Sequence, residues 1–61
     1  MNADRIKSAL ALVHEYERSE SRKSAYRRAL RIVLLTEVER DVLARALLLT
    51  PDEILWAHKD G

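Results

Sequence analysis

The sequence predicts an all-α fold: a small bundle of three to four helices, in which a helical hairpin is followed by one or two shorter helices. Ten Leu and eight Ala supply most of the apolar residues, and both types favour helices. Phe is absent and the one glycine is the last residue, Gly61, so β hairpins would lack obvious turns. Apolar residues also recur at helical spacing along the chain.

The small size of the chain predicts a single helical domain over residues 1–61 that needs support. Below about 70 to 80 residues a core rarely contributes more than ~3–5 kcal/mol, so small proteins depend on disulfides, metals, good helix packing or self-association. The absence of Cys excludes disulfides and thiolate-bound metals. We therefore expect a homodimer. Since the sequence shows no signal peptide and no membrane-spanning stretch, we also expect a reducing cytoplasm and no membrane association.

The first half of the chain predicts two helices. In the first helix, apolar residues from Ile6 to Tyr16 lie on one helical face. This helix is expected to begin at residue 2 or 3, where Asn2 is the better cap, and to run to about Arg18. Residues 19–21 predict a bend, but no Gly or Pro enforces it, so a continuous helix is the alternative. The second helix covers residues 22–35, with cations on one face. Its apolar face holds Ala25, Tyr26, Ala29, Leu30, Ile32 and Val33.

Two capping patterns divide the second half. Thr36 followed by Glu39 predicts a capping box that begins a third helix, and one long helix over residues 22–49 is the alternative. Thr50 is followed by Pro51, which suits the first helical position, so a short fourth helix begins there and ends near His58. The third helix is expected to turn these residues inward: Val38, Val42, Leu43, Ala46 and Leu47.

Leucine is in excess at the ends of the second and third segments. Residues 32–35 would cover nearly the whole circumference of a helical turn, and such a turn must be buried on more than one side. A chain of this size cannot easily cover these side chains itself, so we expect a dimer interface there. The predicted dimer residues are Leu34, Leu35, Leu47, Leu48 and Leu49.

The net charge of +1 conceals a segregated distribution. Residues 18–31 hold six Lys or Arg against one Glu, whereas residues 37–61 hold six acidic residues against three basic ones. Lys23, Arg27 and Arg31 line one edge of the second helix, with Arg28 beside them. Three interpretations compete: a solvated face paired with the protein's own carboxylates, a surface for an acidic protein partner, and a surface for nucleic acid phosphates.

The positions of the aromatic residues in the sequence disfavour nucleic acid binding, because none of these residues forms an interleaved set with the arginines, as base stacking would require. They are Tyr16, Tyr26 and Trp56. Trp56 stands beside Ile54 and Leu55, and it is either a cap on the core or an anchor in an interface, where Trp and Arg dominate binding energies.

One stretch resembles a DNA-binding motif. Residues 35–43 followed by 49–54 resemble the opening of the helix-turn-helix of LuxR-type regulators and of sigma-factor region 4, over about a third of the chain and with a spacing one residue shorter. The resemblance implies that the helix after Thr50 would enter a DNA groove. Asp52 and Glu53 would then meet phosphates and base edges, which is unfavourable, so we interpret the likeness as a shared capping pattern.

No catalytic or metal site is predicted. His14 has Glu15 and Glu17 nearby but no facing pair of ligands, and His58 stands at a helix terminus. No nucleophile motif or glycine-rich phosphate loop occurs, and the chain leaves little volume for a pocket. We therefore expect no cofactor, no metal and no enzymatic activity.

The function that these features favour is that of a non-catalytic interaction or regulatory protein, of the kind carried by phages, plasmids and bacterial operons. It would bind and modulate a larger protein through its arginine-rich helix face and Trp56. The predicted partner-binding residues are Lys23, Arg27, Arg28, Arg31 and Trp56. The alternative is a small DNA- or RNA-binding regulator that uses the same arginines on phosphates.

Overall fold

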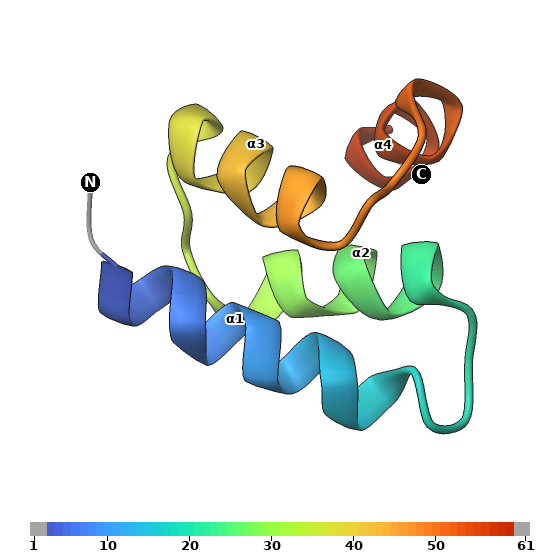
Figure 1. Ribbon diagram of the computed structural model, residues 1–61, viewed down its shortest axis with the longest axis horizontal. Helices are drawn as coiled ribbons and strands as arrows, with labels where there is room; N and C mark the ends of the chain where they lie inside the picture. Colours follow the sequence, from blue (N-terminus) through green and yellow to red (C-terminus); the bar gives the residue numbers. More distant parts are fainter. Residues whose placement is uncertain (1–2, 60–61) are drawn as a thin grey trace.

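The computed structural model describes residues 3–59, and these residues form four α helices and no strand (Figure 1). The helices are α1 (Ala3–Tyr16), α2 (Arg22–Ile32), α3 (Glu37–Ala46) and α4 (Pro51–His58). The predicted all-α fold is therefore confirmed, while the predicted cap at Asn2 lies outside the described residues. None of the four helices is long and apolar enough to cross a lipid bilayer.

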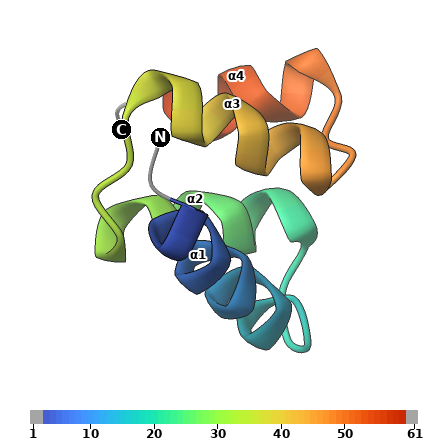
Figure 2. The same cartoon turned by 60° about the vertical axis from the view of Figure 1, so that its left-hand side comes forward.

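The helices pack as two layers. α1 and α2 lie side by side as an antiparallel hairpin, and α3 and α4 cover one side of it (Figures 1 and 2). Within that second layer α3 packs mainly against α1, whereas α4 packs against α2. The arrangement brings the last helix of the chain beside the cationic second helix, which no local pattern in the sequence indicates.

The bend between α1 and α2 is real, so the continuous helix is excluded. α1 ends at Tyr16, two residues before the expected Arg18, and the Tyr16 carbonyl accepts bonds from the N–H groups of Ser19 and Glu20 at 3.1 Å each. Ser21 then caps α2, because its hydroxyl accepts the Ser24 N–H at 3.3 Å. A serine cap thus ends the connection without Gly or Pro.

The capping box predicted at Thr36 is present, and the cap predicted at Thr50 is also a capping box. The Thr36 N–H donates to Glu39 Oε1 at 2.9 Å while the Glu39 N–H donates to Thr36 Oγ1 at 3.2 Å. Thr50 and Glu53 repeat the same two bonds at the same two distances. Thr36 therefore begins a separate helix, and the alternative of one long helix over residues 22–49 is wrong.

The chain leaves α2 earlier than expected. The helix ends at Ile32, and Val33 has extended backbone angles, φ −105° and ψ 119°. Side chains alternate along an extended segment, so Leu35 turns into the core at 9% exposure while Leu34 is 86% exposed. The expectation that residues 32–35 form a helical turn that is apolar all round is therefore wrong.

The inward face of α3 differs from the predicted one. Leu43 is buried as expected, but Val38 is 62% exposed and Ala46 is exposed too. Glu39 and Ala44 take their places, and Glu39 is only 2% exposed. The cap explains the difference: the Glu39 carboxylate folds back onto the Thr36 N–H, so this side chain can be buried with a partner.

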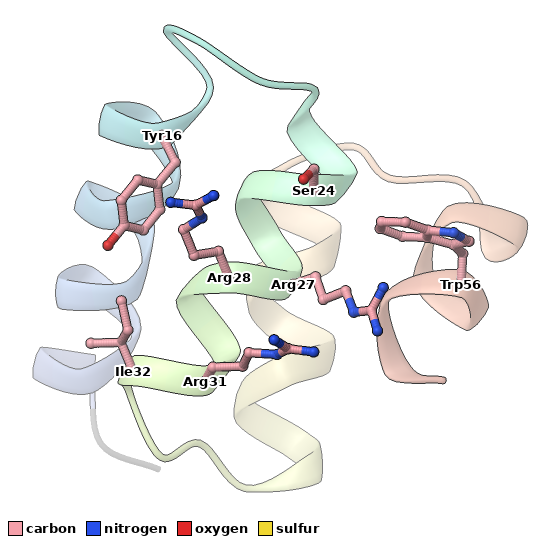
Figure 3. A pocket seen from close by; sticks show the side chains of 7 residues that line it. All are labelled: Tyr16, Ser24, Arg27, Arg28, Arg31, Ile32 and Trp56. Carbon is pink, nitrogen blue, oxygen red and sulfur yellow. The ribbon is translucent and has the colours of Figure 1, made fainter. Parts of the chain in front are cut away.

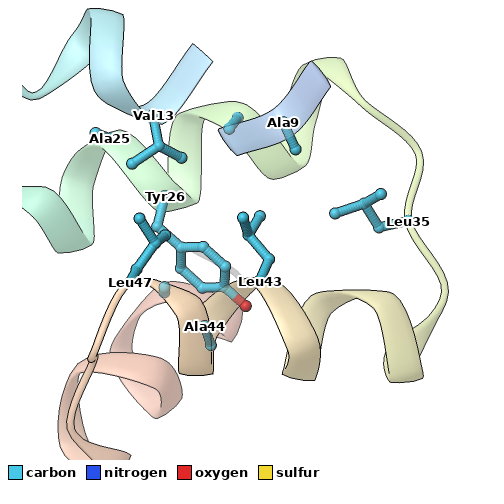
Figure 4. Close-up of a cluster of buried hydrophobic side chains, with 10 residues drawn as sticks. Ala9, Val13, Ala25, Tyr26, Leu35, Leu43, Ala44 and Leu47 are labelled. Atoms are coloured by element: carbon cyan, nitrogen blue, oxygen red, sulfur yellow. The ribbon is translucent and has the colours of Figure 1, made fainter. Parts of the chain in front are cut away.

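The core is built around one large side chain. Tyr26 projects from α2 into the space between the helix layers and is fully buried (Figure 4). Its hydroxyl donates to the Arg40 carbonyl at 3.3 Å and lies 2.6 Å from His58 Nε2, and burial raises the pKa of Tyr26 to about 12. The other buried apolar residues are Ala9, Val13, Ala25, Ala29, Leu35, Leu43, Ala44, Leu47 and Ala57. With five alanines among them, the core is small.

The five leucines of the predicted dimer interface do not share one surface. Leu35 and Leu47 belong to the protein's own core, at 9% and 2% exposure, and Leu49 is partly buried against it. Leu34 and Leu48 are exposed, at 86% and 82%, and they flank α3 at its two ends. Only these two of the five are open to a second copy of the chain.

Candidate functional site

The cationic face of α2 divides between two neighbours. Lys23 and Arg27 turn toward α4, where the Lys23 Nζ lies 4.9 Å and the Arg27 Cζ 5.0 Å from the centre of the Trp56 ring. At such distances a cation is attracted to the aromatic face. Arg28 turns the other way, toward α1 (Figure 3). Its Cζ lies 5.0 Å from the centre of the Tyr16 ring.

Arg28 is also held by an acidic residue of the bend. Its Nη2 lies 3.1 Å from Glu20 Oε2, and the other oxygen of Glu20 accepts the Ser24 hydroxyl at 3.0 Å. Glu20 is thus bound by two residues of α2, and it fixes the direction of Arg28 over Tyr16. The Arg28 side chain is therefore oriented by an ion pair and a ring contact together.

Between these two pairs lies an open groove of about 500 Å³. It crosses α2, with the end of α1 on one side and α4 on the other (Figure 3). No acidic side chain lines it. The lining residues are Tyr16, Ser24, Arg27, Arg28, Arg31, Ile32 and Trp56.

Four of the five predicted partner-binding residues line this groove, and the fifth, Lys23, lies over the Trp56 ring. The structure thus places the arginine face and the tryptophan, which stand far apart in the sequence, on one surface. The helix spacing of the cations could be predicted from the sequence. The participation of Tyr16 and Ile32 could not, because it depends on how α1 packs against α2.

One sequence-based expectation is overturned here. None of the aromatic residues was expected to interleave with the arginines, yet Lys23 and Arg27 lie over the Trp56 ring and Arg28 lies over the Tyr16 ring. The reason is tertiary: α4 packs beside α2, and the end of α1 lies on its other side. Tyr26 is the exception, because it is buried in the core.

The two histidines have structural partners. His14 Nδ1 lies 3.0 Å from Glu17 Oε1, and Arg22 Nε donates to Glu17 Oε2 at 2.8 Å. The bonds from Arg22 and His14 hold the pKa of Glu17 below its ordinary value of 4.5. His58 contacts the Tyr26 hydroxyl, and burial, together with the charge of Arg40, lowers its pKa. Within residues 3–59 no three His, Asp or Glu side chains gather as a metal site requires.

Comparison of the chain with protein-family models, with curated proteins and with solved structures finds no match. The groove on α2 is therefore interpreted from its own chemistry.

Proposed function

We propose that this chain is a non-catalytic interaction protein that binds and modulates a larger protein partner with an acidic surface. The observation that supports this is the meeting of Trp56 with the arginine face of α2 in one groove. Trp, Tyr and Arg are the residues on which binding energies concentrate, and all three types line the groove.

The charge of the groove supports an acidic partner. Arg27, Arg28 and Arg31 line it, and although Arg28 pairs with Glu20 of the bend, none of the lining residues is acidic. Arg31 makes no ion pair within the described part of the chain, so it can offer its whole guanidinium fork to a carboxylate. A complementary negative surface would gain both orientation and association rate.

The test is affinity capture from the native host with a matched pair of charge reversals. Arg28→Glu alters the groove, whereas Arg45→Glu makes the same change on α3, outside it. We expect the native chain and the Arg45→Glu variant to capture the same host protein. The Arg28→Glu and Trp56→Ala variants should fail to capture it. With that protein purified, the groove variants should bind about tenfold more weakly or worse in calorimetry. Equal retention by all four chains would contradict the proposal.

The second candidate function is nucleic acid binding, and the interleaving of rings and cations favours it. Trp56 with Lys23 and Arg27, and Tyr16 with Arg28, supply the two features that single-stranded ligands use, stacking faces and phosphate contacts. An affinity for oligonucleotides that falls steeply with salt would support this function. No change in the fluorescence anisotropy of any labelled single strand or duplex at low salt would exclude it.

We also propose that the chain forms a homodimer, through Leu34 and Leu48. Two leucines exposed above four-fifths are a cost to a chain with a small core unless another surface covers them. Light scattering during chromatography should give twice the chain mass, declining with dilution, and the variant Leu34→Glu/Leu48→Glu should give one chain mass. A single chain mass across about a hundred-fold dilution would refute the dimer.

A further inference from the structure

A second, smaller pocket lies beside the groove, where α2, α3 and α4 meet. Its volume is about 160 Å³. Arg27 and Arg31 of α2 reach into both hollows, since they line the groove as well (Figure 3). Arg40 of α3 and Lys59, which follows α4, line the small pocket but not the groove, and Arg40 also lines a separate pocket of about 350 Å³ with Glu37 and Asp41. The remaining lining residues are Leu30, Ala57 and His58.

The charge of this pocket is one-sided. Four permanent cations line it, two from α2, one from α3 and one from Lys59, which follows α4, and none of its lining residues is acidic. Like charges brought together repel one another, so the folded protein gains from an anion placed among them. The carbonyl groups at the end of α4 oppose an anion there, and Lys59, which follows that helix, offsets them.

Arg40 supplies an independent sign of a missing ligand. Its Nε is buried and has no hydrogen-bond partner within the described residues, and its guanidinium makes no ion pair there. A buried N–H without a partner costs free energy, so the Arg40 side chain gains if a ligand draws its guanidinium into the pocket, where this N–H can meet an acceptor. Arg40 is also the residue of the pocket that α3 contributes, so an acceptor bound to it would join α3 to the other two helices.

The volume limits the ligand. Sites for drug-sized molecules span about 300–1,000 Å³, so 160 Å³ is too small for a nucleotide or a peptide segment. One water molecule occupies about 30 Å³ of liquid, so the pocket has room for a group that displaces a few waters. A tetrahedral oxyanion has this size and presents enough oxygens for several arginines at once.

We propose that this pocket binds a phosphate group, as free inorganic phosphate or as the end of a small phosphate monoester. Phosphate suits the site better than a carboxylate, because it carries up to two negative charges and presents more acceptor oxygens to the several cations. The His58 ring beside the Tyr26 hydroxyl adds a polar wall to the pocket. This inference does not require a protein partner, although it shares two arginines with the partner-binding groove.

Calorimetric titration of the full chain with inorganic phosphate, and separately with glycerol phosphate, tests the site and distinguishes the free ion from the monoester. The variants Arg40→Gln and Lys59→Gln remove cations of the small pocket that do not line the groove, while Arg28→Gln makes the matched change in the groove and not in the small pocket. We expect Arg40→Gln to weaken phosphate binding about tenfold, Lys59→Gln to weaken it less, and Arg28→Gln to leave it unchanged. Lys59 is exposed, so its variant keeps the test open if Arg40→Gln unfolds.

Nuclear magnetic resonance provides the second readout. Phosphate should shift the signals of the Arg40 side chain and of the His58 ring, and sodium chloride at equal ionic strength should not. Equal shifts with chloride, no heat with either phosphate compound, or equal loss in Arg28→Gln would overturn the proposal. Failure of the partner proposal is distinguishable, because it would appear as unchanged capture by Arg28→Glu while phosphate binding persists.

Discussion

The segments that lead into α3 and α4 carry almost the same sequence. In both, two leucines precede a threonine, and a glutamate follows three residues after it: Leu34 to Glu39, and Leu48 to Glu53. Both threonines cap their helices with the same bonds, and in both the first leucine is more than four-fifths exposed. The shared pattern therefore produces the same local structure twice.

The two segments differ in what surrounds the cap. Glu39 is only 2% exposed, whereas Glu53 is partly open to solvent on the rim of the molecule. The backbone differs too, because Leu48 has φ 58°, the one positive φ at a non-glycine residue within residues 3–59. The local sequence determines that each cap forms, and the packing of the rest of the chain determines how much that cap contributes to the stability of the fold.

The largest expected effect comes from replacing the buried glutamate. Glu39→Ala leaves the Thr36 N–H without its acceptor and empties the space that the buried Glu39 side chain fills, so we expect a loss of about 2 kcal/mol of unfolding free energy. For a chain of this size such a loss corresponds to a fall of roughly 8–16 °C in melting temperature. Chemical denaturation followed by circular dichroism measures it, at one fixed protein concentration.

Glu53→Ala is the matched control for this change. Water can replace the Glu53 carboxylate at the Thr50 N–H, so the loss should be clearly smaller than for Glu39→Ala. Equal losses in the two variants would mean that burial does not distinguish the caps, and the comparison between the two segments would fail.

The threonines should behave alike. Thr36→Ala and Thr50→Ala each remove a hydroxyl that accepts a glutamate N–H at 3.2 Å, and both threonines are exposed. We expect each variant to lose about 1 kcal/mol of unfolding free energy. Denaturation midpoints that differ by more than experimental error would show that one cap is supported by contacts beyond its own box.

Local signals in the sequence were sufficient to predict much of this fold. The caps at Thr36 and Thr50, the bend before Ser21 and the inward face of α1 all depend on residues within a few positions of each other. The prediction of the inward face of α3 was wrong. Two overlapping sets of residues at helical spacing were possible, and the set that is buried includes an acidic residue, Glu39, which made it resemble a solvent-facing set.

The candidate groove shows the same limit. Helical spacing alone predicted the row of cations from Lys23 to Arg31. The pairing of that row with Trp56 and Tyr16 needs α4 and the end of α1 on either side of α2, and both are tertiary placements. The small basic pocket needs three helices at once, so no spacing rule could indicate it.

The leucines before the two caps offer a finer test. Leu48 occupies the left-handed position after α3, where its N–H bonds the Arg45 carbonyl and the next N–H bonds the Ala44 carbonyl. Glycine takes this conformation without strain, so Leu48→Gly should raise the unfolding free energy of the monomer by about 0.5–1 kcal/mol. Leu34→Gly should lower the unfolding free energy, because Leu34 has no positive φ whose strain a glycine would remove. Dilute samples in chemical denaturation keep the proposed dimer from contributing to the measurement, and a stabilised Leu34→Gly would contradict this account.

The smallest effect is the pH dependence that Glu53 contributes. Hydrogen bonds from the Thr50 backbone and hydroxyl lower the pKa of Glu53 below its ordinary value of 4.5. A carboxyl group with a lowered pKa stabilises the fold above its unfolded pKa, and this contribution disappears as the pH falls through the folded value. The unfolding free energy should therefore decline below about pH 4.5, and less steeply in Glu53→Gln, whose amide oxygen still accepts the Thr50 N–H but does not titrate. Denaturation curves of the two proteins on either side of that pH, compared as a difference, remove the contributions of the other carboxylates. Parallel pH profiles would show that the exposed cap binds its glutamate too weakly to be linked to folding.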